Sequence, residues 1–229
     1  CSRTRPTLRA HPQVRIVLFR IDSHSTLQHL QTSLVSSTTE DLRDFLAALV
    51  HAILRARAVY PQHAFTTRRL FDLAVHRARH TPLRTYIDGV VDAAIELNER
   101  NELHALVVLL LDAEQPNAIL ERYVLYVQAT ADVGDDDVRS LAGQLRGFLL
   151  RLQACETTLP RLPANELTFR VELHSKDVAE GPPFSDELRS RWVECNVPEE
   201  VGDAGGPVAP LKSLTSPKLS MELLVQQAE

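Results

Sequence analysis

Apolar residues recur at helical spacing in three segments of the chain. In the first segment they lie three or four positions apart, beginning after Thr38 and Thr39 and continuing until a proline stops the pattern. Either threonine would cap this helix, because its hydroxyl accepts a hydrogen bond from an unpaired backbone N–H. The spacing recurs over 81–98, with Thr81 as the N-cap, and over 135–152, which opens on three aspartates. Three amphipathic helices are therefore predicted.

Four further segments have the apolar patterns of strands. Residues 64–75 alternate weakly between apolar and polar and are typical of short strands or a hairpin. Residues 103–111 are apolar on both faces, which indicates a central strand, and a turn joins them to the predicted partner strand 118–128. Residues 167–174 alternate cleanly, and the residues expected to face inward are Leu167, Phe169, Val171 and Leu173. These strands are expected to form one mainly antiparallel sheet.

The end of the chain combines a loose loop with another strand pattern. The stretch GDAGGP is rich in glycine, so its backbone is permissive, and the segment 207–225 follows it. Alternation predicts one buried face in that segment: Leu219, Met221, Leu223 and Val225. The tail is therefore expected to leave the domain and return to the sheet.

The order of these elements predicts an α+β fold, with three helices packed on a mainly antiparallel sheet. Residues 1–33 differ from the rest in being rich in Ser, Thr, Arg and His, and only VRIVLF (14–19) has strand character. We interpret residues 1–33 as a flexible or non-native extension, with a structured element as the alternative. Residues 34–229 are expected to form one domain.

Composition excludes several classes of function. The formal net charge is −5, so no strong direct binding to nucleic acid is expected. No stretch has the eighteen or so consecutive apolar residues of a membrane span, so no membrane partner is expected. The three cysteines, Cys1, Cys155 and Cys195, are far apart and odd in number, which favours a reducing cytosolic or nuclear compartment.

No catalytic motif stands out in the sequence, which has neither a glycine-rich phosphate loop nor a GxSxG elbow. The run Asp135–Asp137 could hold a divalent ion, but an acidic helix N-terminus explains it more simply. His76 and His80 could form half a zinc site, but a solvated basic loop is favoured. Cys155 is interpreted as a small buried residue rather than a nucleophile. We therefore expect no enzyme activity, no cofactor and no metal.

Arginines gather in one part of the chain and form its only basic patch. They lie in and around the predicted hairpin and the start of the second helix: Arg68, Arg69, Arg77, Arg79 and Arg84. A solvated face is the favoured interpretation, and contact with an acidic partner or a phosphate is the alternative.

Five stretches together resemble a known family. They are RAVYPQHAF (57–65), HTPLRTYI (80–87), LHALVVLLLDAEQPNAILERYVLYV (103–127), QLRGFLLRLQACE (144–156) and PLKSLTSPKLSMELLV (210–225). In this order they resemble the HORMA-domain family, and within it the accessory subunits of DNA polymerase zeta. The resemblance implies a HORMA fold in residues 34–229.

The resemblance implies a division of that domain and a mechanism of binding. Residues 34–174 would be the core, and residues 175–229 a C-terminal safety belt that closes over a partner peptide. The peptide would be a proline-containing segment of the polymerase catalytic subunit. By position, Tyr60, Tyr86 and Trp192 are implied to form the aromatic walls that grip it.

Further partners are also implied by the resemblance. The surface facing a Y-family scaffold polymerase would contain Val208, Leu211, Glu222 and Leu224. Arg146 matches an arginine of the family used in HORMA homodimers or heterodimers. A remodelling ATPase would help to release partners. The implied role is a non-catalytic adaptor in translesion DNA synthesis.

Two other hypotheses stay open at this point. The chain could be a spindle-checkpoint or meiotic-axis HORMA adaptor with a different closure-motif partner. It could also be a small enzyme that uses Cys155 or the aspartate run, which the missing base disfavours. For the adaptor of polymerase zeta the expected location is the nucleus, with the cytoplasm as an additional location.

Overall fold

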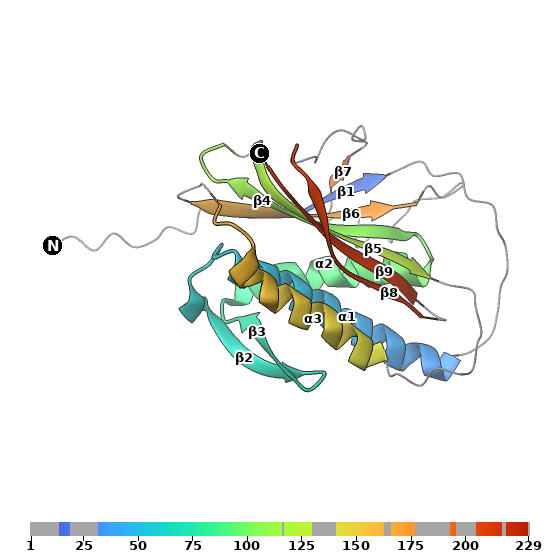
Figure 1. Cartoon of the computed structure of the whole chain (residues 1–229). Helices are drawn as coiled ribbons and strands as arrows, with labels where there is room; N and C mark the ends of the chain where they lie inside the picture. Colours follow the sequence, from blue (N-terminus) through green and yellow to red (C-terminus); the bar gives the residue numbers. More distant parts are fainter. Residues whose placement is uncertain are drawn as a thin grey trace.

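A seven-stranded sheet lies on a layer of three α-helices in the computed structural model (Figure 1). The structure describes residues 14–18, 32–115, 117–129, 141–162, 166–176, 193–195, 205–216 and 219–228. Within these residues the fold is α+β with a mainly antiparallel sheet, as the sequence predicts.

The three described helices are α1 (Thr32–Ala56), α2 (Thr81–Glu99) and α3 (Leu141–Thr158). The bounds of α2 agree closely with the prediction, but its N-cap is His80, which makes no side-chain capping bond, so the prediction of Thr81 as cap was wrong. Asp135–Asp137, expected to open α3, lie outside the described residues.

The predicted start of α1 was also wrong. The helix begins at Thr32, so Thr38 and Thr39 lie inside it and cannot be its N-cap. Serine and threonine are only mildly unfavourable within a helix, so a cap-like pair does not by itself mark a start.

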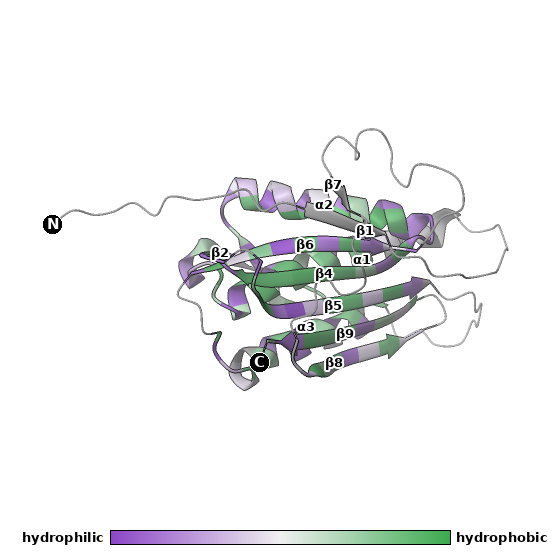
Figure 2. Ribbon diagram, turned by 90° about the horizontal axis from the view of Figure 1, so that it is seen from above, coloured by the Kyte–Doolittle hydropathy of each residue, from purple (hydrophilic) through white to green (hydrophobic). Residues whose placement is uncertain are grey.

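The sheet has the order β7-β1-β6-β4-β5-β9-β8, and Figure 2 shows the strands from above. Its strands are β1 (Val14–Leu18), β4 (Leu103–Asp112), β5 (Ile119–Ala129), β6 (Leu167–Ser175), β7 (Val193–Cys195), β8 (Val208–Thr215) and β9 (Leu219–Gln227). Strands β6, β4, β5, β9 and β8 pair antiparallel in that order. The central hairpin predicted from sequence is β4–β5.

The predicted short hairpin is also confirmed. Strands β2 (Phe65–Leu70) and β3 (Leu73–Ala78) pair antiparallel through a two-residue turn. Phe71 and Asp72 have φ values of 48° and 58°, as in the turn that best matches the twist of a tight hairpin. The hairpin lies against the helical layer, on the side away from the large sheet (Figure 1).

The core lies between the helices and the sheet, and the tail contributes to it. Leu219, Met221, Leu223 and Val225 of β9 are all buried, so the predicted inward face is confirmed. Strand β9 pairs with β5 along its whole length, which explains how a tail behind a glycine-rich loop is held. Across the described ranges, no helix is both long and apolar enough to cross a membrane.

Candidate functional site

The outer edge of β6 carries two strands from distant parts of the chain. Strand β1 pairs with β6 in parallel, with Val14 opposite Val171 and Leu18 opposite Ser175. Strand β7 then pairs in parallel with β1. The structure therefore places residues 14–18, within the segment expected to be flexible, inside the sheet between β6 and β7. The boundary of the extension at residue 33 stays a prediction.

Two of the three predicted aromatic walls meet beside this edge. Tyr60 and Tyr86 both contact Phe169 of β6 edge-on, with ring centroids 6.2 Å and 5.7 Å apart respectively. Tyr60 follows α1 and Tyr86 lies on α2, so three elements converge on one phenylalanine. Such edge-to-face contacts stabilise a fixed ring geometry. Trp192, the third predicted wall, lies outside the described residues, directly before β7 in the sequence.

The hydroxyl of Tyr86 points to the same edge. Burial raises the pKa of Tyr86, and the backbone of Val171, the first residue of β6 to pair with β1, partly opposes this shift. The hydroxyl makes no hydrogen bond of ordinary geometry in the described structure. Burial also raises the pKa of Tyr60. Both phenols are therefore neutral, which suits apolar or proline-containing ligands better than charged ones.

The opposite face of β6 is charged but buried. Glu172 lies between Arg170, whose Nε is 2.9 Å from Glu172 Oε1, and His174, whose Nε2 is 3.5 Å from Oε2. On the neighbouring strand, burial lowers the pKa of His104, and His174 and Lys176 lower it further. Parts of β6 have the purple colour of hydrophilic residues in Figure 2. It gives the edge of β6 a polar face and an apolar face.

The predicted scaffold-facing residues lie on the hairpin β8–β9 at the other edge of the sheet. Val208 is 55% exposed and Glu222 is exposed, whereas Leu211 and Leu224 are half-buried. The pairing of β8 with β9 shifts register between Pro210 and Lys212, so Leu211 occupies an irregular position. An irregular edge strand resists pairing with another sheet, so contacts here are expected to use side chains.

A buried ion pair anchors this hairpin. Arg57 Nε lies 2.7 Å from Glu121 Oε2 at the start of β5, and Gln227 of β9 donates a 2.8 Å hydrogen bond to Glu121 Oε1. Arg57 also donates to the carbonyl of Pro160, which follows α3. Burial raises the pKa of Glu121, while Arg57 lowers it. One carboxylate thus joins the helical layer to the tail.

Two other predicted residues lie on α3. Arg146, expected in a dimer contact, is half-buried on this helix, and its role stays a prediction. Cys155 is buried and burial raises the pKa of its thiol. A nucleophile would need a lowered pKa and access to substrate, so the structure disfavours the enzyme hypothesis for Cys155.

The paired histidines do not form a helical metal motif. His76 lies in β3 and His80 precedes α2, so the two are not one turn apart on a helix. In the described parts of the chain, no cluster of three His, Cys, Asp or Glu residues could hold a metal ion.

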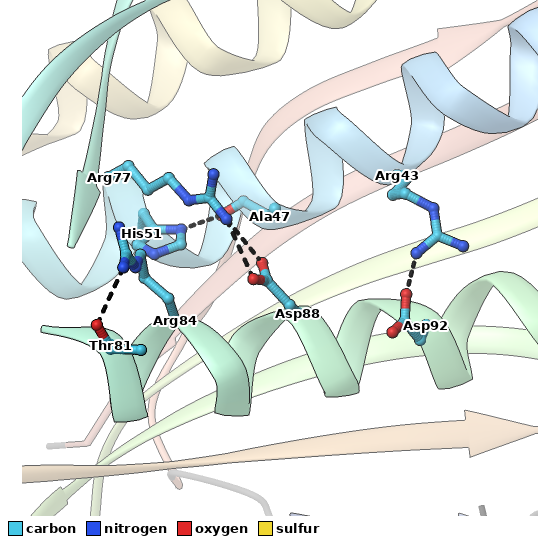
Figure 3. Close-up of polar contacts among 8 residues, drawn as sticks. All are labelled: Arg43, Ala47, His51, Arg77, Thr81, Arg84, Asp88 and Asp92. Carbon is cyan, nitrogen blue, oxygen red and sulfur yellow. Dashed lines mark hydrogen bonds and ion pairs between the residues drawn. The ribbon is translucent and has the colours of Figure 1, made fainter. Parts of the chain in front are cut away.

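The arginine patch lies beside a hollow of about 300 Å³ between α1, α2 and the hairpin β2–β3. Arg77 donates hydrogen bonds to both oxygens of Asp88, at 3.1 and 3.3 Å, and Arg43 pairs with Asp92 (Figure 3). Asp44 also lines the hollow. Because aspartates alternate with arginines, the lining has no strong single charge. The solvated-face interpretation is therefore favoured over a phosphate site.

His51 lies buried beneath these ion pairs. Its Nδ1 is 2.7 Å from the carbonyl oxygen of Ala47, and its exposed fraction is 1% (Figure 3). Burial lowers its pKa; Arg77 of β3 and Arg84 of α2 lower it further, while the Ala47 carbonyl and Asp88 oppose the shift. The folded chain therefore holds His51 neutral at a pH where an exposed histidine is protonated.

Acidification should consequently destabilise the protein through His51. Below about pH 6.5 the unfolded chain binds a proton that folded His51 does not. The free energy of unfolding therefore decreases as the pH is lowered. The loss stops once the pH is below the lowered pKa. Relative to His51→Gln, the wild type should lose up to about 1.4 kcal/mol per pH unit in this window. Urea unfolding at pH 7.5, 6.5 and 5.5 measures the difference, and parallel curves would contradict it.

Sequence reasoning missed two parts of the site. Phe169 was expected to face inward, but nothing in the sequence indicates that two tyrosines from distant segments meet on it. Strand β1 was also missed as a member of the sheet, although VRIVLF carried a signal. A five-residue strand far from its partner has no local feature that specifies where it pairs.

The fold has counterparts among known proteins. The model of the HORMA domain matches residues 39–161. The chain belongs to the HORMA domain family.

Among particular relatives, the chain is similar to the mitotic spindle assembly checkpoint protein MAD2B of Homo sapiens, with 28% identity, covering 81% of this chain and 89% of the relative. It is also similar to the DNA polymerase zeta processivity subunit of Arabidopsis thaliana, with 25% identity, covering 81% and 83%. DNA polymerase zeta subunit 2 of Drosophila melanogaster is 27% identical, covering 58% and 68%.

Solved structures share the fold. A chain of the mitotic checkpoint complex aligns with a TM-score of 0.66 and 19% identity, covering 84% of this chain and 99% of that one. The C. elegans protein HTP-1, solved bound to the HIM-3 closure motif, aligns with a TM-score of 0.61 and 14% identity, covering 84% and 90%.

Proposed function

We propose that this chain is a non-catalytic adaptor subunit of the translesion DNA polymerase zeta. The observation that carries the proposal is similarity to polymerase zeta subunits and MAD2B proteins over four-fifths of the chain. The buried Cys155 thiol, with its raised pKa, fits a role without catalysis. The adaptor traps a proline-containing peptide of the catalytic subunit under a safety belt formed by residues 175–229.

The peptide binds as an extended strand at the outer edge of β6. An added strand gains main-chain hydrogen bonds from the edge, while neighbouring side chains select its sequence. Tyr60 and Tyr86, held on Phe169 beside this edge, present neutral aromatic rings to a proline. Trp192, one residue before β7, completes the walls. The closed belt is supported by the pairing of β9 with β5.

Replacing Tyr86 or Trp192 with alanine should weaken peptide binding by about 30-fold, or about 2 kcal/mol, because each ring forms a large desolvated contact. Fluorescence anisotropy with a labelled peptide of the catalytic subunit from the same cells measures this change. Tyr126→Ala is the matched control, since Tyr126 packs on His104 away from the tyrosine cluster. Equal affinities for Tyr86→Ala, Trp192→Ala and the control would contradict the proposal.

The second partner is a Y-family scaffold polymerase, bound on the hairpin β8–β9. Val208 and Glu222 are exposed there, and half-buried Leu211 and Leu224 complete the surface. Arg146 on α3 contacts a second HORMA domain in a homodimer or heterodimer. A remodelling ATPase releases the partners, and the adaptor works in the nucleus, with a further pool in the cytoplasm.

A spindle-checkpoint or meiotic-axis adaptor is the alternative. It is favoured by the likeness in fold to a chain of the mitotic checkpoint complex and to HTP-1, both below 20% identity. Affinity purification from the protein's own cells separates the two. Recovery of a polymerase catalytic subunit supports the first function, and recovery of checkpoint or axis proteins without it supports the second.

A further inference from the structure

The strand that pairs with the outer edge of β6 belongs to this chain itself. Residues 14–18 lie between β6 and β7 and run parallel to both. This is the edge at which the partner peptide is proposed to bind, so one location has two candidate occupants.

The register of β1 is the one that an apolar ligand of this edge requires. Val14 lies opposite Val171 and Ile16 opposite Leu173, and both β6 residues are buried in the main core. Between them Arg15 lies opposite Glu172 in the backbone register. A shift of β1 by one residue would place Arg15 opposite a buried apolar residue of β6 and an apolar residue opposite Glu172. This register is therefore specific.

Strand β7 closes the far side of β1. Ile16 is paired on both sides, with Leu173 of β6 and with Glu194 of β7. The occupant is therefore an inner strand, whose backbone groups have partners on two sides, rather than a loose edge strand. The part of the chain after β6 thus encloses its own N-terminal segment.

The connection to the domain is short enough for this arrangement. Residues 19–31 give thirteen positions between β1 and α1, which span at most about 45 Å when extended. A short tether holds its ligand at an effective concentration on the order of millimolar. A free peptide at micromolar concentration would need roughly 1,000-fold higher intrinsic affinity to compete.

We infer that residues 14–18 are an intramolecular closure strand, a resident ligand of the β6 edge that a partner peptide must displace. We call the position between β6 and β7 the slot. Its ligand is then an extended strand of about five residues that runs parallel to β6 and has alternating apolar positions. Only one part of this inference rests on the proposed function, namely the identity of the peptide that competes with residues 14–18.

Ile16→Pro in the full chain tests this directly. Proline removes an N–H and is excluded from inner strands, so it should free the slot. The probe is a labelled synthetic peptide of residues 11–20. It should bind Ile16→Pro at least tenfold more tightly than the wild type or the control Thr7→Pro, which lies outside β1. Equal binding to all three, or no binding to Ile16→Pro, would overturn the inference.

A second measurement starts from the wild type. Amide exchange at residues 14–18 should be at least 100-fold slower than in the free peptide, because an inner strand is protected. Exchange at the rate of the free peptide would refute the inference. Ile16→Asp covers the case in which proline prevents folding, and it should lose this protection. Neither the labelled peptide of residues 11–20 nor the amide-exchange measurement involves a polymerase sequence. Both results are therefore independent of polymerase binding.

Chain association distinguishes an intramolecular strand from an exchanged one. The wild type should be a monomer in light scattering at concentrations where the strand is protected. A dimer that Ile16→Pro dissociates would show that the strand is donated to a second copy, and would overturn the intramolecular form.

Discussion

Replacing Glu121 with alanine should lower the free energy of unfolding by about 3–5 kcal/mol. Glu121 is fully buried and forms an ion pair with Arg57, whose exposed fraction is 8%. Removing the carboxylate leaves the guanidinium in the interior, where within the described residues the Pro160 carbonyl still accepts a hydrogen bond from it. It also deprives Gln227 of its acceptor at the end of β9. Urea unfolding followed by circular dichroism measures the loss.

Two variants show whether the cost arises from a buried, unpaired charge. Asp92→Ala removes a partner of Arg43 in an exposed ion pair and should change stability by less than about 1 kcal/mol. The double variant Arg57→Met with Glu121→Leu should recover most of the loss, because no unpaired charge is left. A Glu121→Ala protein as stable as the wild type would show that the pair does not anchor the tail.

The same variant should loosen the tail more than the rest of the sheet. Glu121 is paired in register with Gln227, and the backbone N–H of Ala228 donates to Leu120 at the same end. Amide exchange in β9 should therefore accelerate before exchange in β4 does. This would identify the hydrogen-bond network around Glu121 as the anchor that keeps the hairpin β8–β9 on β5.

Periodicity predicted most elements of this fold, because their signals are local. The helix α2, the hairpin β4–β5 and the strand β6 lie within about two residues of their predicted bounds. Each of these elements is nine or more residues long, so its pattern repeats several times. The buried face of β9 was predicted for the same reason, since alternation alone decides which residues face the core.

The parts that were missed depend on contacts distant in sequence. The pairing of Glu121 with Arg57 spans 64 positions, and neither residue has a neighbour that indicates it is buried. The pairing of β1 with β6 joins Val14 to Val171, which lie even further apart in the sequence. Periodicity describes how one segment divides between two faces, but it does not specify which distant segment covers each face.

Replacing Phe169 with alanine should have a second large effect, on stability and on peptide binding together. Phe169 is 3% exposed, and the rings of Tyr60 and Tyr86 both rest on it. The cavity left by the ring should lower the free energy of unfolding by about 3–5 kcal/mol. Thermal and urea unfolding measure this loss.

Peptide binding shows whether Phe169 supports the binding site or only packs in the core. Phe148→Ala is the matched control, because Phe148 is also fully buried and also contacts one ring edge-on, Phe45 at 5.7 Å, but lies on α3. It should lose similar stability. At a temperature where both variants are folded, Phe169→Ala should bind the polymerase peptide at least tenfold more weakly than Phe148→Ala, since Tyr60 and Tyr86 lose the surface that orients them. Equal binding by the two variants would mean that the tyrosines do not form the wall of the slot, and the ligand would then be held by main-chain pairing with β6 alone.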